Sequence, residues 1–235
     1  MSAKFPTLIK RLRSLGNEAN RAGMARFGIN TDRAFGISVT NLRSIAKEVG
    51  KDHALAKELW ASGYHEARML ATLIDEPKQV SEAQLESWVK DIHSWDLCDG
   101  FAGNLVDKTP LAYDKAIEWA NRNGEFVRRA GFALMAWLPV HDKKVADKNF
   151  VPFFPIIARH ASDERNYVKK AVSWALRNLG KRNSVLHRKA IQTAREISKQ
   201  ESRAAKWVAN DALRELRSDQ VRARLARKAE SGKRK

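Results

Sequence analysis

HEARMLATLI (65–74) begins a pattern that returns as FVRRAGFALMAWL (126–138), YVKKAVSWALRNL (167–179) and AAKWVANDALREL (204–216). In each stretch apolar residues recur at three- and four-residue spacing, which predicts an amphipathic helix. Each stretch also places a basic residue before or at the first apolar step, with an alanine-rich face behind it. Taken in order, these basic residues are Arg68, Arg129, Lys170 and Lys206.

The spacing of these four cations indicates a repeat. They are 61, 41 and 36 residues apart, and Asp99 divides the longest interval into steps of 31 and 30. Helix pairs that recur every ~30–45 residues are typical of HEAT-like or armadillo-like solenoids. We therefore expect an all-α solenoid whose concave face carries a column of cations. The alternative is a generic helical bundle in which basic, alanine-rich helices look alike by chance.

The rest of the chain also reads as helices separated by Gly, Pro, Asn and Asp, without a convincing strand. Ser81 with Gln84 forms a capping-box pattern, and Asp163 is placed to cap the helix that Gly180 ends. We divide the chain into a repeat domain, 1–217, and a basic helix end with a flexible tail, 218–235. The expected helices are 5–15, 39–49, 52–61, 64–74, 81–92, 95–106, 111–122, 125–138, 149–160, 164–180, 184–199 and 203–229.

The charge balance indicates a polyanionic partner. The chain has 44 Lys+Arg against 27 Asp+Glu, a formal charge of +17. A folded protein this basic binds nucleic acid by releasing counterions, although a solvated basic surface or a charged tail would give the same total. Residues 181–235 supply 17 Lys+Arg and 6 Asp+Glu, so much of the excess lies near the C-terminus.

Other features of the sequence exclude several classes of protein. A single cysteine excludes a disulfide scaffold and a thiolate zinc cluster and fits a reducing compartment. The first residues lack the apolar segment of a signal peptide, and the longest apolar run, 132–140, is about half a membrane span. We expect a soluble, cytoplasmic and nucleoid-associated monomer that makes no membrane contact.

One helix combines an aromatic ring with an acid. In SWDLCD (94–99), Trp95 and Asp99 are i,i+4 neighbours on the same flank of the apolar face. Asp96 is directed further out, and Cys98 lies at the centre of the apolar face, where a buried inert thiol is expected. A carboxylate in a basic groove would stabilise developing positive charge or activate water, and the alternative is an ion pair with Arg129 that ties two repeats together.

Two further helices contribute candidate residues. Arg129 lies at the margin of its helix's apolar face, over a possible groove, whereas Arg128 points away and is expected to be solvated. Trp174 lies on the polar face of its helix, between Lys170 and Arg177. It either packs against a neighbouring helix or offers an aromatic surface to a sugar or base. The remaining tryptophans considered are interpreted as core or inter-repeat packing: Trp60, Trp88, Trp119, Trp137 and Trp207.

The sequence indicates neither a metal nor an organic cofactor. It contains none of the patterns GxGxxG, GxxxxGK[ST], HExxH or GxSxG. The histidines lack ligand spacing and are interpreted as surface or packing residues: His53, His65, His93, His141, His160 and His187.

SWDLCD (94–99), FVRRAGFAL (126–134) and KKAVSWALR (169–177), in this order on a helical repeat, resemble the AlkD-like family of DNA alkylation repair glycosylases. The resemblance spans about residues 20–215. It implies an all-helical solenoid that holds duplex DNA on a concave basic face. It also implies hydrolysis of the N-glycosidic bond of cationic alkylated purines, chiefly N3-alkyladenine and N7-alkylguanine, without flipping of the base.

The resemblance also assigns residues. It places the catalytic aspartate on Asp99, the sugar-contacting tryptophans on Trp95 and Trp174, and the arginine beside the lesion on Arg129. The family's N-terminal aromatic residue falls on either Phe27 or Phe35, and the extension past about residue 217 has no counterpart. The cations expected to contact DNA are Arg68, Lys170, Arg177 and Lys206.

Three functions remain at this point. The first is a monofunctional alkylpurine DNA glycosylase acting on double-stranded DNA with alkylated bases. The second is a non-catalytic HEAT-repeat protein that binds DNA structures, with Asp99 as a tether between repeats. The third is a HEAT-type protein scaffold whose affinity for DNA vanishes near physiological salt.

Overall fold

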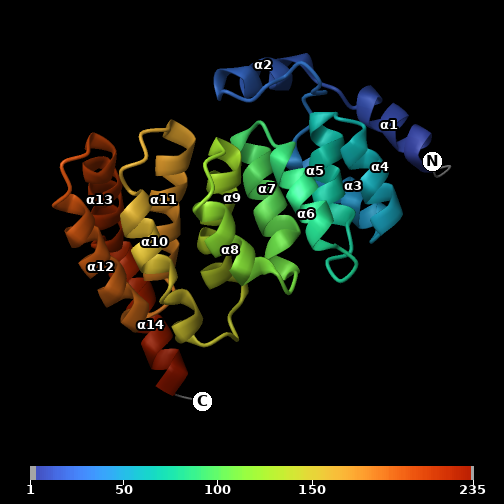
Figure 1. The fold of residues 1–235 in the computed structure, drawn as a ribbon. Helices are drawn as coiled ribbons and strands as arrows, with labels where there is room; N and C mark the ends of the chain where they lie inside the picture. Colours follow the sequence, from blue (N-terminus) through green and yellow to red (C-terminus); the bar gives the residue numbers. More distant parts are fainter. Residues whose placement is uncertain (1–3, 234–235) are drawn as a thin grey trace. The chain divides into compact units, whose positions relative to one another are not determined.

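A computed structural model describes residues 4–233, which contain fourteen α-helices, two short 3-10 helices and no strand (Figure 1). The expected all-α class is therefore confirmed. The chain divides into two compact units, Met1–Leu111 and Ala112–Lys235. No helix within residues 4–233 is long and apolar enough to cross a membrane.

The first unit places α3, α5 and α7 in one row. α5 packs against both α3 and α7, and α4 also packs against α5. The helices of the unit are α1 (Lys4–Ser14), α2 (Glu18–Arg26), α3 (Val39–Val49), α4 (His53–Ala61), α5 (His65–Ile74), α6 (Glu82–Lys90), α7 (Trp95–Asn104) and η1 (Val106–Lys108).

Three aromatic rings form part of the core of the first unit. Trp60 of α4 and Trp88 of α6 stack with ring centroids 4.1 Å apart, and Phe101 of α7 packs against both rings. All three side chains are buried. The packing role expected for the two tryptophans is confirmed, and it fixes α4, α6 and α7 together.

A buried carboxylate anchors the segment between α2 and α3. Glu66 of α5 is 1% exposed and accepts hydrogen bonds from the backbone N–H groups of Phe35, Gly36 and Ile37 at 2.8, 2.6 and 3.1 Å. Gly36 has φ +81°, and a Cβ there would lie 2.1 Å from the carbonyl oxygen of Asn17. Glycine is therefore required, because the chain turns with positive φ while it presses against the start of α2.

The second unit consists of two layers of helices. α9, α11 and α13 pack in one row, while α8, α10 and α12 pack in the other (Figure 1). The helices of the unit are α8 (Ala112–Ala120), α9 (Glu125–His141), η2 (Asp147–Phe150), α10 (Phe153–His160), α11 (Asn166–Gly180), α12 (Ser184–Ser198), α13 (Arg203–Leu216) and α14 (Asp219–Lys233).

A glycine allows α8 and α9 to approach closely. A Cβ on Gly131 of α9 would lie 2.2 Å from the backbone nitrogen of Ala120 in α8. Trp119, beside this contact, is fully buried, which confirms its expected packing role. The glycine sets the separation of this helix pair because even a methyl group would collide with backbone atoms.

The structure corrects two local predictions. Residues 203–229 form two helices, because α13 ends at Leu216 and the hydroxyl of Ser218 accepts a hydrogen bond from the N–H of Val221 in the first turn of α14. The helix α2 was missed because none of its residues is buried. Residues 234–235, the end of the predicted tail, lie outside the described residues.

Two capping predictions are also corrected. Asp163 does not cap α11; Arg165 occupies the N-cap position, and Asp163 accepts from the N–H of Arg165 instead. Ser81 caps α6 as expected, but the side chain of Gln84 donates to Asp75. Gln84 thus bonds a tertiary partner instead of the local backbone, whereas Asp163 bonds the local N–H of Arg165 and also the guanidinium of Arg128.

Candidate nucleic-acid interface

Trp95 and Asp99 lie on the half-buried flank of α7. Leu97, Cys98 and Phe101 form the buried face of the helix, with Cys98 fully inaccessible as expected. Trp95 and Asp99 are each partly exposed. Their i,i+4 spacing puts both residues on the same side of α7.

Trp95 is tied to the segment that follows α2. Its indole N–H donates to the carbonyl oxygen of Phe27 over 3.0 Å, and the Phe27 side chain is 73% exposed. Phe35 instead stacks on Tyr64 with ring centroids 4.8 Å apart. Of the two candidate N-terminal aromatic residues, Phe27 is thus the one beside Trp95. An apolar groove of about 520 Å³ lies here, and its lining includes Met24, Phe27, Ile37, Leu42, Met69 and Trp95.

Asp96 is not directed away from the fold, which corrects the sequence prediction. Its Oδ2 lies 2.8 Å from Nε2 of His65 on α5. Burial alone would lower the pKa of His65, but the hydrogen bond and charge of Asp96 hold that pKa above its usual value. Apolar periodicity does not reveal this pair; its only sequence signal is the separation of 31 residues, which equals the step from Arg68 to Asp99.

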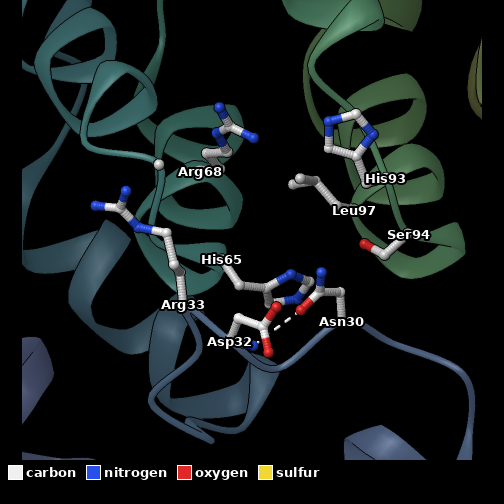
Figure 2. A pocket seen from close by; sticks show the side chains of 9 residues that line it. Asn30, Asp32, Arg33, His65, Arg68, His93, Ser94 and Leu97 are labelled. Carbon is white, nitrogen blue, oxygen red and sulfur yellow. Dashed lines mark hydrogen bonds between the residues drawn. The ribbon is translucent and has the colours of Figure 1, made fainter.

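Arg68 makes contacts within the first unit. Its Nε donates to the carbonyl oxygen of Trp60 and its Nη1 to that of Asp91, and the guanidinium lies 5.3 Å from the Trp60 ring. Burial lowers the pKa of Arg68. Arg68 also lines a pocket of about 340 Å³ (Figure 2), together with Asn30, Asp32, Arg33, Gly63, His65, His93, Ser94 and Leu97.

The adjacent arginines of α9 are both held by the fold. Arg129 is 5% exposed, and its Nη1 donates to the carbonyl oxygen of Tyr167 at 2.6 Å, which links α9 to α11. The prediction that Arg128 is solvated is wrong. Its Nη1 lies 2.8 Å from Oδ2 of Asp163, and its Nε donates to the carbonyl oxygen of Arg122. These acceptors come from the loops beside the helix, which a helical projection does not include.

Trp174 contacts the preceding helix of its own layer. It meets Trp137 of α9 edge to face, with ring centroids 5.2 Å apart and planes at 83°. The packing alternative considered for Trp174 is therefore realised, yet the ring remains half-buried, and it lines a shallow cleft of about 240 Å³ with Trp137 and Lys181. The contact fixes the orientation of the ring without covering it.

The other cations of the second unit differ in their surroundings. Lys170 and Lys206 are exposed, whereas Arg177 is bound by Glu215 and lies 3.4 Å from Asp211. The prediction that Trp207 packs in the core or between repeats is wrong. Trp207 is 39% exposed and lies beneath the ammonium of Lys169, because alanine and valine side chains fill the buried face of α13.

The candidate residues share a position in the architecture of their units. Arg68, Trp95 and Asp99 belong to the row α3, α5 and α7. Those of the second unit belong to the row α9, α11 and α13. Convergence of the two groups on one lesion stays a prediction. Among the described residues, no group of three His, Cys, Asp or Glu is placed to hold a metal ion.

Recurring helix pairs in two layers define a HEAT-like repeat protein. The family described as "DNA alkylation repair enzyme" matches residues 8–216, so the chain belongs to that family and the resemblance is confirmed. A search of curated proteins gave no match.

A solved structure has the same fold. It is described as "a new family of proteins related to the HEAT-like repeat DNA glycosylases with affinity for branched DNA structures". It matches with a TM-score of 0.75 and 23% identity, over 89% of this chain and 94% of the other. At this identity the likeness establishes the fold.

Proposed function

We propose that this protein is a monofunctional DNA glycosylase that hydrolyses the N-glycosidic bond of cationic alkylated purines in duplex DNA, without flipping the base. N3-alkyladenine and N7-alkylguanine are the proposed substrates. Membership in the DNA alkylation repair family supports the reaction class. The observation that carries the proposal is the pairing of Trp95 and Asp99 on the flank of α7, with both side chains partly exposed.

The chemistry requires one carboxylate. When the C1′–N bond breaks, its electron pair goes to the purine, and the cationic base leaves as a neutral molecule. No general acid is therefore needed. Positive charge develops on the deoxyribose, where Asp99 stabilises it electrostatically. Water then attacks C1′, and its proton passes to Asp99 or to solvent, which leaves an abasic sugar.

The remaining residues position the substrate. Trp95 and Trp174 would contact the deoxyribose of the lesion, because an indole face suits the apolar side of a sugar. Arg129 would lie beside the lesion, where its positive charge would attract the flanking phosphates. Its bond to Tyr167 pre-organises the guanidinium, so little side-chain entropy is lost when DNA binds.

The test is release of free base from duplex DNA that contains N7-methylguanine. The wild-type protein should release base, and Asp99→Asn should lower the single-turnover rate by at least about 100-fold, since it keeps the shape and removes the charge. Asp114→Asn, at an exposed position of α8, is the matched control and should leave the rate unchanged. Equal rates for wild type and Asp99→Asn would refute the proposal.

A second candidate is a binding protein without catalysis. The related solved structure is described by its affinity for branched DNA, and that description favours this alternative. Binding of a labelled four-way junction and of a linear duplex should be compared for wild type and Asp99→Asn. Strong preference for the junction, no base release and equal affinity of both proteins would establish the alternative.

A further inference from the structure

The shallow cleft beside Trp174 continues into a second hollow where α14 meets the ends of α9 and α11. Two adjoining hollows, of about 440 and 240 Å³, share Pro139, Val140, Arg182, Arg224 and Lys228 in their linings. We call this surface the α14 cleft. α14 lies beyond residue 216, where the family match ends.

The position of α14 within the second unit is defined by its contacts. Val221 and Leu225 form its buried stripe. The ammonium of Lys228 donates to the carbonyl oxygens of Lys181 and Arg182 at 3.0 and 3.1 Å, where α11 ends. Carbonyl groups at a helix C-terminus favour a cation, so this contact anchors α14 and brings Arg224 to the cleft.

The cleft gathers positive charge. Its described lining contains Lys143, Lys181, Arg182, Arg224 and Lys228, and neither aspartate nor glutamate. Lys181 and Arg182 have acidic partners just outside the lining, Glu215 and Asp147 respectively. Lys143 and Arg224 are exposed.

The cations lie close enough to Lys228 to affect its pKa. Burial lowers its pKa, and the charges of Arg224, Arg182 and Lys143 lower it further. Gathering like charges costs free energy in the unbound protein. An anion in the cleft would relieve this repulsion.

An aromatic edge connects the cleft with the candidate interface. Trp137 and Trp174 line the smaller hollow together with Arg224 and Lys228. A cationic hollow beside indole rings suits a sugar–phosphate backbone, in which phosphates alternate with apolar sugar faces. A small inorganic anion or an acidic peptide has no comparable alternation.

We propose that the α14 cleft binds backbone phosphates of DNA beside Trp174, with Arg224 and Lys143 as the principal contacts. This inference rests on the proposed function only in taking DNA as the ligand, and it does not depend on base release. The cleft extends the DNA-binding surface beyond the part of the chain that matches the family.

The first experiment measures binding of an undamaged, fluorescently labelled duplex at several salt concentrations. The double variant Arg224→Gln/Lys143→Gln should lose about two phosphate contacts, so the slope of log K against log salt should fall by about 1.8. The double variant Lys148→Gln/Lys199→Gln changes the charge equally at exposed positions outside the cleft, and should keep the wild-type slope.

Cross-linking provides a second readout that does not depend on stability. Cys98 is buried, so a photoreactive maleimide should label Arg224→Cys at position 224. The labelled protein should cross-link to the duplex, and Lys199→Cys should not. Equal slopes for the two double variants, cross-linking no greater than the Lys199→Cys control, or a wild-type protein that does not bind duplex would overturn the inference. Absence of base release with a reduced slope would instead refute only the proposed function.

Discussion

The two candidate tryptophans are held by different means in the two units. Trp95 in the first unit donates a hydrogen bond to the carbonyl oxygen of Phe27, in an exposed segment. Trp174 in the second unit makes an edge-to-face contact with Trp137 on a packed helix. A polar tether fixes one ring, and direct packing fixes the other.

The elements that support the two tryptophans are also held differently, one by hydrogen bonds and the other by close packing. The segment behind Trp95 is anchored through backbone hydrogen bonds to the buried carboxylate of Glu66. The helix behind Trp174 is set by the glycine contact between Gly131 and Ala120. Loss of the Glu66 carboxylate should therefore release one segment, whereas a methyl group added at Gly131 should strain a whole helix pair.

The largest effect is expected for Glu66→Ala. Three backbone N–H groups lose a charged acceptor, so unfolding free energy should fall by about 4 kcal/mol. Hydrogen exchange of residues 35–37, together with urea denaturation, measures this change. Glu18→Ala, at an exposed ion pair, is the control with little expected effect. Unchanged exchange at residues 35–37 would contradict the anchoring role.

Gly131→Ala should cost about 3 kcal/mol of unfolding free energy, because its Cβ would collide with backbone atoms of α8. Urea denaturation measures the loss. Gly23→Ala is the control: a Cβ there meets nothing within 4 Å, and the helix should gain up to about 1 kcal/mol. Similar stabilities of the two variants would argue against close packing as the constraint.

Asp163→Asn should lower the unfolding free energy by about 2 kcal/mol near neutral pH. Burial opposes ionisation, but hydrogen bonds from Arg165 and Arg128 lower the pKa of Asp163 from 3.8 to about 2. The stabilisation is therefore present above pH 3.8 and is lost as the pH falls towards 2. Melting temperatures across this range should converge for wild type and variant, while Asp219→Asn at an exposed position should match wild type throughout. A difference independent of pH would contradict the assignment.

The smallest loss of stability is expected for substitutions of the two tryptophans, which compare the two ways of holding a ring. Trp95→Phe keeps an aromatic ring but removes the donor to Phe27, and should cost about 1 kcal/mol with faster amide exchange in residues 24–30. Trp174→Phe keeps its edge-to-face partner and should leave exchange near Trp137 almost unchanged. Equal responses would show that the polar tether does not hold Trp95.

Much of the fold could be predicted from sequence because helical periodicity is local. Most helix bounds follow from the spacing of apolar residues, and the flank shared by Trp95 and Asp99 follows from helix geometry alone. The tertiary partners could not be predicted in this way. Arg128 and Asp96 both looked solvated in projection, yet Asp163 and His65 approach them from other elements.

The sequence by itself determined the all-α class, the repeat and the residue types of the candidate site, because these depend on the spacing of residues along the chain. The tertiary structure decided which side chains remain accessible. Arg68, Arg129 and Arg177 make contacts within their units, whereas Lys170, Lys206 and Arg224 are exposed. The physical reason is that an arginine finds its acceptors on neighbouring helices and loops, and their positions are set by packing rather than by periodicity.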